Sequence, residues 1–241
     1  MTHSSAYGKV HGFSTPEAMV GLTGNDAPPS RPGKPAGSLP GGMLELSSDV
    51  DPDLDDLFAS WCDHHHREVV ALPGVLRARR YLRVDGQPGL GRYLTVYDLA
   101  SVAVLDTPAF TDHGRTGTPM PDALAPSLAY QRTVAALVGR AGDTSGAEVV
   151  VRATTVGIPE GAAAFAAGLV APLSGEGGVI GARVYRVEGE PASTWLVLLD
   201  CSGSGDELRA VMTTRPWREA AAYRRVFDRS APSSPPTGNR G

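Results

Sequence analysis

The feature that most constrains this chain is an internal repeat. A segment beginning at Val75 and ending at Asp98 aligns with a second segment between Val179 and Asp200, and each follows a glycine. The identical residues at matched offsets are Ala78, Arg79 and Tyr81 in the first segment and Ala182, Arg183 and Tyr185 in the second. Because repeated sequence encodes a repeated structural unit, the chain is expected to fold as two copies of one motif.

The surroundings of the two segments repeat as well. Upstream, we expect a short strand at 43–50 and at 148–156, each followed by a helix that starts at a Pro-acid pair. Proline and an acidic side chain both suit the first turn of a helix. Downstream, a second helix is expected near 101–113 and again near 205–227. The common order of these elements predicts a βαββα unit in each copy.

A sheet covered by helices on one face needs a partner for its other face. Two copies in one chain can cover each other, so we predict an α+β fold of two tandem ferredoxin-like βαββα units that form an intramolecular barrel. The predicted organisation is a disordered tail over 1–42, a first repeat over 43–118, an extra helix and linker over 119–146, a second repeat over 147–229 and a disordered tail over 230–241.

Composition excludes several classes of function. The 241 residues carry a formal net charge of −4, whereas nucleic-acid binding by bulk charge needs a basic surface. No apolar run reaches the ~18 residues of a membrane span, and no signal peptide is apparent. The two cysteines lie far apart, so neither a disulfide framework nor a cysteine-rich zinc site is indicated. We therefore expect a cytoplasmic protein without nucleic-acid or membrane partners.

Several short motifs resemble the dimeric α+β barrel superfamily, in particular its EthD-like and antibiotic-biosynthesis-monooxygenase-like branches. The motifs are Asp51-Pro52 through Trp61, the run His64–His66, Leu72-Pro73-Gly74, Ala78-Arg79-Arg80-Tyr81 and Tyr93-Leu94-Thr95-Val96-Tyr97. The resemblance covers residues 43–115 well and 147–225 only through the repeat. It implies a barrel fold with a ligand cleft. It does not choose a reaction, because members include cofactor-free monooxygenases, cyclases, isomerases, haem enzymes and proteins of no known activity.

Alternation along the strands sorts side chains by face. Apolar residues such as Leu44, Ala78, Leu94 and Val96 are expected under the helices. The opposite face of the first copy is then polar and should line the cleft with Glu45, Arg79, Tyr81, Tyr93, Thr95 and Tyr97. The matching positions of the second copy are more apolar and include Tyr185, Trp195, Val197 and Leu199. An ordinary barrel interior, with Glu45 and Arg79 as a structural ion pair, remains the alternative.

The run His64–His66 is the most conspicuous group of titratable residues. Consecutive helical residues point about 100° apart, so three adjacent imidazoles cannot share one metal ion from one face. No metal site is therefore predicted. Counting from Trp61 places the cleft histidine at His66, whereas counting back from Pro73 places it at His65. Either imidazole could move protons near neutral pH, or could simply pack in the interface.

These observations favour an enzyme of specialised polyketide or aromatic metabolism: an oxygenase, cyclase or isomerase without a tightly held cofactor. Its ligand would be a small apolar or aromatic molecule. The expected catalytic residues are His65, His66, Tyr97 and Glu45, and the expected substrate-binding residues are Arg79, Tyr81, Tyr93, Thr95 and Trp195. The alternative is a non-catalytic ligand-binding or accessory protein of the same fold. The sequence leaves open whether the chain forms a further homodimer.

Overall fold

The computed structural model describes residues 40–85, 91–144, 147–157, 161–170, 178–190, 194–202, 212–213 and 217–232. Eight strands form a closed barrel: β1 (Gly42–Asp49), β2 (Val75–Arg83), β3 (Tyr93–Leu99), β4 (Ala129–Gly142), β5 (Val149–Val156), β6 (Val179–Val187), β7 (Thr194–Cys201) and β8 (Glu219–Ser230). The helices are α1 (Asp55–Ala71), α2 (Pro108–Thr116) and α3 (Ala162–Val170), with two 3-10 turns, η1 (Pro52–Leu54) and η2 (Val102–Asp106). Both tails predicted to be disordered lie largely outside the described residues.

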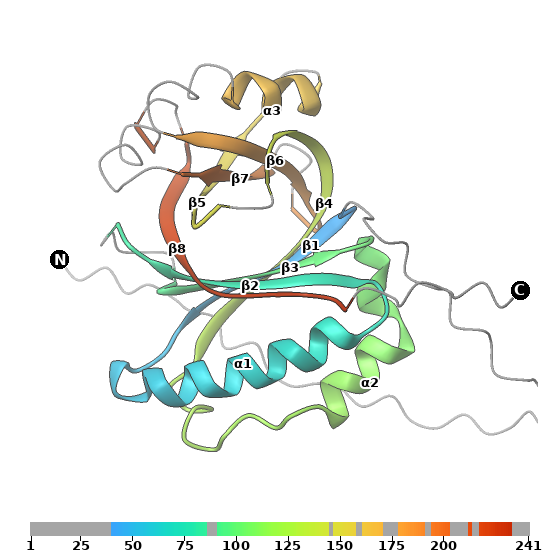
Figure 1. Cartoon of the computed structure of the whole chain (residues 1–241), viewed down its shortest axis with the longest axis vertical. Helices are drawn as coiled ribbons and strands as arrows, with labels where there is room; N and C mark the ends of the chain where they lie inside the picture. The colour runs from blue at the N-terminus through green and yellow to red at the C-terminus, as the bar shows by residue number, and fades with distance from the viewer. Residues whose placement is uncertain are drawn as a thin grey trace, which may run out of the picture. The chain divides into compact units, whose positions relative to one another are not determined.

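The strand order confirms the duplication. The first half has the order β4-β1-β3-β2 and the second half has the order β8-β5-β7-β6, with every neighbouring pair antiparallel. The halves join where β2 pairs with β8 and where β4 pairs with β6. The two tandem ferredoxin-like units therefore close an α+β barrel within one chain, as predicted. In Figure 1, α1 and α2 cover one side of this barrel, and α3 lies on the opposite side.

The last strand of each unit was missed by the sequence prediction. The extra helix expected within 119–146 is wrong, because 129–142 forms β4, and the helix expected near 205–227 is wrong where β8 begins at Glu219. The rest of that second segment lies mostly outside the described residues. Both strands are rich in alanine and arginine, which favour helices in isolation. Pairing on both edges overrides that propensity. The first unit is βαββαβ, and within the described residues the second unit has four strands in the same order, with α3 between β5 and β6.

Helix α1 begins and ends where local chemistry requires. The carboxylate of Asp51 accepts a hydrogen bond from the backbone N–H of Asp53 at 3.1 Å, just before the first helical turn. Asp55 and Asp56 then place negative charge at the positive end of the helix dipole. The helix ends at Ala71, two residues before Pro73, which cannot donate a helical hydrogen bond. This helix carries the histidine run across the sheet of the first half.

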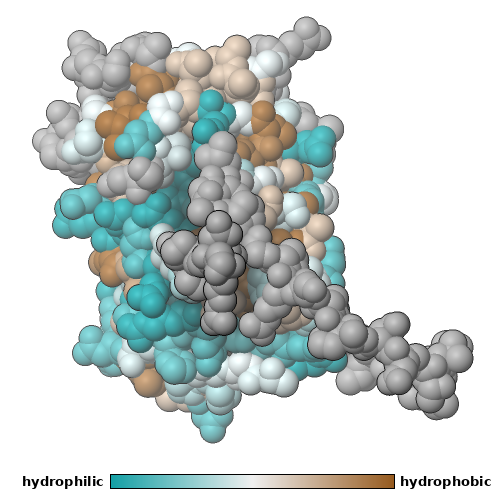
Figure 2. All heavy atoms as spheres, turned by 45° about the vertical axis from the view of Figure 1, so that its right-hand side comes forward, coloured by the Kyte–Doolittle hydropathy of each residue, from teal (hydrophilic) through white to brown (hydrophobic). Residues whose placement is uncertain are grey.

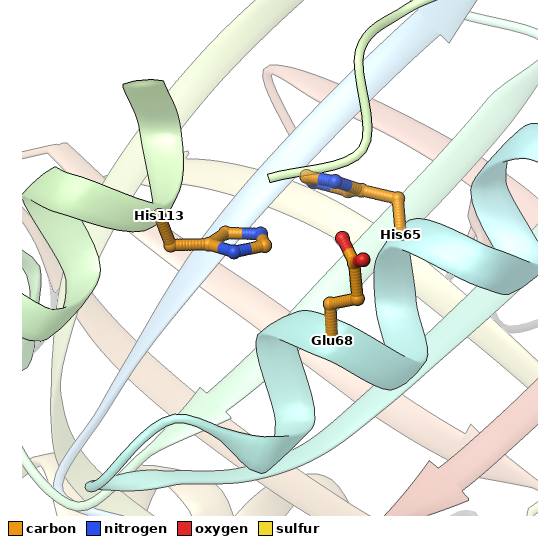
Figure 3. Close-up of side chains that lie close together, drawn as sticks. All are labelled: His65, Glu68 and His113. Carbon is orange, nitrogen blue, oxygen red and sulfur yellow. The ribbon is translucent and has the colours of Figure 1, made fainter. Parts of the chain in front are cut away.

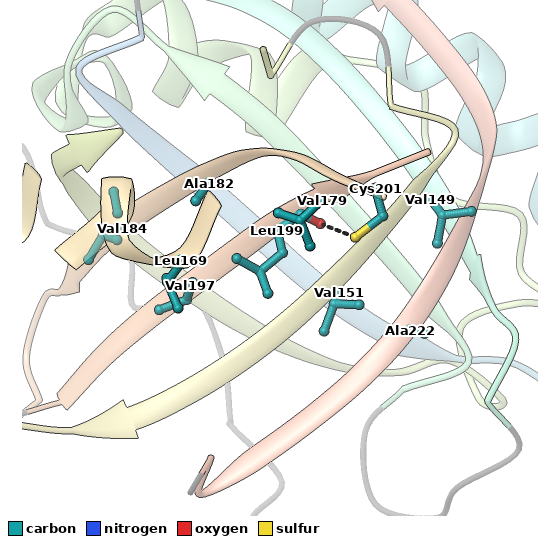
Figure 4. Packing of buried hydrophobic residues seen from close by; sticks show 11 residues of the cluster. Val149, Val151, Leu169, Val179, Ala182, Val184, Val197, Leu199, Cys201 and Ala222 are labelled. Carbon is teal, nitrogen blue, oxygen red and sulfur yellow. Dashed lines mark hydrogen bonds between the residues drawn. The ribbon is translucent and has the colours of Figure 1, made fainter. Parts of the chain in front are cut away.

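The apolar side chains form three layers. All eight strands contribute to the barrel interior, with residues such as Met43, Leu94, Val150 and Leu196. A second layer lies between α1 and the outer face of the first half. A third lies between α3 and the outer face of the second half, where Figure 4 shows aliphatic side chains around Cys201. The functional question is which of these layers contains polar groups that packing does not explain.

The surface differs between the two ends of the barrel. Helix α3 exposes alanines at 163, 164 and 167, and Figure 2 shows apolar atoms gathered at the end that carries this helix. Hydrophilic atoms predominate toward the end with α1 and α2. Among the described helices, none is long and apolar enough to span a membrane.

Candidate functional site

Strand β3 presents the opposite faces from those predicted. Leu94 and Val96 point into the barrel, whereas Tyr93 and Tyr97 pack under α1. The register explains this, because Val96 pairs with Arg79, and residues paired across antiparallel strands share a face. The prediction failed because the barrel interior is itself apolar, so hydrophobicity alone did not distinguish it from the layer under the helix. Trp195 likewise packs in the layer under α3, outside the barrel.

The barrel interior does contain Glu45, Arg79 and Tyr81, as predicted, but the two charged groups have partners. Arg79 donates to Asp98 at 2.5 Å. Arg183, the repeat equivalent of Arg79, donates to Asp200 at 2.9 and 3.0 Å and approaches Asp98 at 3.4 Å. These four buried charges form one balanced network made from equivalent positions of the two halves. Its simplest role is to satisfy charges inside the barrel.

Glu45 pairs with Arg152, not with Arg79 as the alternative interpretation supposed. The Nε and a terminal nitrogen of Arg152 lie 3.0 and 2.9 Å from the Glu45 carboxylate. The two residues hold equivalent positions, because each lies three residues after the start of its strand and pairs opposite the matched residues Val96 and Leu198. The two equivalent positions therefore carry opposite charges, Glu45 in the first half and Arg152 in the second, and these charges meet inside the barrel.

A different set of polar groups lies between α1 and the outer face of the sheet. Its centre is His66, whose ring meets the edge of Tyr97 at a centroid distance of 5.4 Å. Arg80 lies in the same layer, donates to the carbonyl of Ala59 at 3.2 Å and forms an ion pair with Asp63 at 3.0 Å. All three of His66, Arg80 and Tyr97 are at most 4% exposed.

Several polar atoms in this layer lack a protein partner. Within the part of the chain that the structure describes, His66 Nδ1, Arg80 Nε and the Tyr97 hydroxyl are buried and make no hydrogen bond. Buried polar groups are almost always hydrogen-bonded, and those that are not require an explanation. We call His66, Arg80 and Tyr97 the α1 polar cluster. Its free donors and acceptors could serve a bound molecule.

Burial controls the protonation of the cluster. Desolvation, together with the positive charges of Arg80 and His65, lowers the pKa of His66 from 6.5 to about 3, so its imidazole is neutral at pH 7. Desolvation also raises the pKa of Tyr97 well above 10, so its hydroxyl remains a donor. The thiol of neighbouring Cys62 has its pKa raised to about 11 by burial, partly offset by Arg80. The cluster thus combines a neutral base, a neutral acid and a fixed cation.

The second half shows that the fold does not need this cluster. In the aligned repeats, Leu199 replaces Tyr97 and Val184 replaces Arg80. Both pack in the aliphatic layer under α3, beside Ala166 and Leu169 of that helix. Two copies of the same unit therefore differ chiefly in the chemistry of the helix-covered layer. The predicted concentration of polar groups on the barrel face of the first copy is not what the structure has, because charged groups of both copies lie inside the barrel. The polar groups that are particular to the first copy lie on the helix side of its sheet.

Helix α1 sends His65 in another direction. Its ring stacks on Trp61 at 5.1 Å and lies 5.3 Å from the ring of His113 in α2. Figure 3 shows these two imidazoles converging with the carboxylate of Glu68. One potential ligand atom from each of His65, Glu68 and His113 lies within 4.8 Å of the other two. The sequence left open which of the two histidines faces the sheet. In the structure His66 faces the sheet, and His65 faces α2.

Of the remaining predicted site residues, Tyr93 and Thr95 lie near the α1 polar cluster, and Tyr81 lies inside the barrel. Tyr93 packs its ring against Phe58 at 4.9 Å, and Thr95 is buried next to Arg80 through the β2–β3 register. Tyr81 lies in the barrel interior. Sequence reasoning missed Arg80 and Cys62. The spacing Phe58–Cys62–His66, one turn apart, marks the buried stripe of α1 and could have identified the inward histidine.

Comparison with known proteins identifies the fold. No protein-family model and no curated protein sequence matches the chain. Among solved structures, an anthrone oxidase-like protein matches with a TM-score of 0.56 at 13% identity, covering 79% of this chain and 92% of that one. A monooxygenase-type protein from Fusobacterium nucleatum matches with a TM-score of 0.48 at 12% identity, covering 78% and 94%. With its strand order and its two joined repeats, the chain has the dimeric α+β barrel fold, with both halves in one polypeptide.

Proposed function

We propose that the chain is an oxygenase-type enzyme that acts on a phenolic or polycyclic aromatic molecule without a tightly held cofactor. The observation that carries this proposal is the α1 polar cluster, in which one buried polar atom of each residue lacks a partner among the described residues, whereas the equivalent layer of the second half is aliphatic. The name of the structural neighbour, an anthrone oxidase-like protein, agrees with this class of reaction.

The groups in the cluster suit a reaction that passes through an anionic intermediate. Arg80 is a buried cation, and Tyr97 offers a hydroxyl that no described residue occupies. Together they could stabilise the oxygen of a phenolate or enolate in a site of low dielectric constant. His66 is neutral and can accept a proton. An anion bound beside it would offset the positive field of Arg80, which helps keep the His66 pKa low, and would make the imidazole a stronger base.

The proposed reaction uses dioxygen as the oxidant. His66 takes a proton from an acidic C–H group beside the aromatic ring, and the carbanion transfers its electrons to dioxygen and forms a C–O bond. The resulting peroxide anion takes the proton back from His66 to give a hydroperoxide, which then loses water to leave a carbonyl group. In balance, CH2 and O2 become C=O and H2O. The polyketide origin of the substrate belongs to this proposal as an expectation from the family resemblance.

The test is oxygen consumption with a panel of anthrones and hydroxynaphthalenes. His66→Asn should lower turnover by about 10²–10⁴-fold, as expected for loss of a general base. Tyr97→Phe should lower it by about 10²–10³-fold, as expected for loss of one oxyanion donor. Because the Tyr97 hydroxyl has no partner among the residues that the structure describes, this change should leave the unfolding free energy nearly unaltered.

The second half supplies a matched control. Tyr185 is also fully buried, and its hydroxyl also lacks a partner among the described residues, but it lies in the barrel interior. Tyr185→Phe should leave turnover unchanged. Loss of activity in this variant, with activity retained in Tyr97→Phe, would place the chemistry inside the barrel. Saturable binding of the panel without oxygen uptake would instead support the alternative, a non-catalytic ligand-binding protein.

A further inference from the structure

We propose that His65, Glu68 and His113 form a binding site for a divalent transition-metal ion of the Zn²⁺ type, at the junction of α1 and α2. This inference is independent of the proposed oxygenase activity. The site joins two neighbouring positions of one helix face to a residue from a separate helix (Figure 3). The argument that three consecutive histidines cannot share an ion still holds, because only the middle one takes part.

The ligand set matches the preferences of such an ion. Two imidazoles and one carboxylate are common ligands of zinc and related metals, with a water molecule completing the coordination. His65 and Glu68 are separated by three residues, so they lie on the same face of α1. The three ligand atoms lie within 4.8 Å of one another, compared with the ~3.4 Å expected around a tetrahedral ion with bonds of ~2.1 Å. Small side-chain rotations would close that difference.

The protein leaves these ligands available. Nδ1 of His65 and Nε2 of His113 are buried and have no hydrogen-bond partner within the described ranges. Desolvation and the neighbouring His113 lower the pKa of His65 from 6.5 to about 4, so its imidazole is neutral at pH 7 and can donate a lone pair. The backbone N–H of Thr118 donates to Oε2 of Glu68 at 3.0 Å and lowers the pKa of that carboxyl group.

Neighbouring residues hold the ligands in place. The indole of Trp61 stacks on the His65 ring at an interplanar angle of 13°. At the end of α2, Gly117 leaves space for the other imidazole, because a Cβ atom there would lie 2.5 Å from Cε1 of His113. Helix α2 itself has no fully buried residue. Phe110 of α2 packs against the apolar layer that includes Val69 and Val70 of α1, and a metal ion would give α2 a second attachment to that helix.

The experiment uses the full chain without an affinity tag, stripped of metal with a chelator and titrated with Zn²⁺ in competition with a chromophoric chelator. We expect one ion per chain. Loss of an outer-sphere partner costs about 10–100-fold in metal affinity, so loss of a direct ligand in His113→Asn or Glu68→Gln should cost at least about 100-fold. Gly117→Ala should also weaken binding, because it displaces the His113 ring. With Co²⁺ in place of Zn²⁺, the wild type should show the visible absorption of a four-coordinate site.

The control is His64→Asn. His64 neighbours the ligands and its Nε2 lies 3.4 Å from Glu68 Oε1, but its side chain is 62% exposed and lies outside the group. Because this exposed contact with Glu68 is weak, its replacement should change the affinity by no more than about fivefold, well below the loss expected in the ligand variants. The proposal is overturned if the wild type takes up no stoichiometric Zn²⁺, if the ligand variants bind as tightly as the wild type, or if His64→Asn loses as much affinity as they do. Circular dichroism of each variant checks folding, and either ligand variant alone decides the outcome.

Discussion

The ion pair between Glu45 and Arg152 allows a quantitative test of the duplication. Both residues are at most 5% exposed, and they hold equivalent positions in the two halves. Removing one partner of a buried pair leaves an uncompensated charge and costs about 3–5 kcal/mol. Glu45→Gln and Arg152→Gln should each reduce the free energy of unfolding by about this amount, a large part of the 5–15 kcal/mol of a typical domain.

The exchanged pair, Glu45→Arg combined with Arg152→Glu, should recover most of the loss. The repeat relationship places each exchanged side chain in an environment like the one it left, and the pair can form again. Recovery will be incomplete because Glu219 lies 3.8 Å from Arg152, although its side chain is 55% exposed and solvent weakens this contact. Urea unfolding of the single and double variants gives the coupling energy. If the exchanged protein is no more stable than the single variants, the equivalence of the two positions is refuted.

Two further predictions concern titration. The pKa of His66 is about 3 in the folded chain against 6.5 when unfolded, so the unfolded state binds the additional proton, and this group contributes a fall in stability of about 1.4 kcal/mol per pH unit as the pH decreases from ~6 toward 4. His65, whose pKa is lowered to about 4, contributes a similar slope over most of this range, so His66→Gln should roughly halve the total slope in urea titrations. An unchanged slope would contradict the assigned burial. Burial raises the pKa values of the Cys62 and Cys201 thiols to about 11 and about 12. Thiol reagents at pH 8 should therefore label both cysteines only after denaturation. Rapid labelling of the native protein would show that one of them is accessible.

The sequence was sufficient for the architecture but not for every element. The repeat predicted two units and their mutual closure because matched residues such as Arg79 and Arg183 occur at matched offsets. Strands β4 and β8 were missed because their alanine-rich sequences favour helices until partners on both edges are considered. That information is tertiary: β8 pairs with β2 of the other half, and no local pattern specifies such a contact.

The candidate site was predicted in part for a related reason. Alternation gave the correct faces for β2, where arginine and tyrosine at Arg79 and Tyr81 contrast with Ala78. It failed for β3, where both faces are buried and hydrophobicity carries no direction. His113 could not be placed beside His65 from the sequence, because their proximity depends on how α2 packs against α1. A register derived from Arg79 opposite Val96 would have corrected β3 without any further data.

The duplication also separates structural polarity from functional polarity. Charges inside the barrel occur in both halves and pair with each other, as Arg79, Asp98, Arg183 and Asp200 do. Single atoms there, such as Arg79 Nε and the Tyr185 hydroxyl, also lack a partner among the described residues, but every charged group of this network has one. The α1 polar cluster occurs in one half only, and its equivalents under α3 are aliphatic. Since an aliphatic layer is sufficient to hold a helix on this sheet, stability does not explain buried polar atoms without partners, which cost free energy in the empty protein. A bound molecule that pairs with these atoms would account for them, and for this reason we propose that the chemistry takes place in the layer under α1.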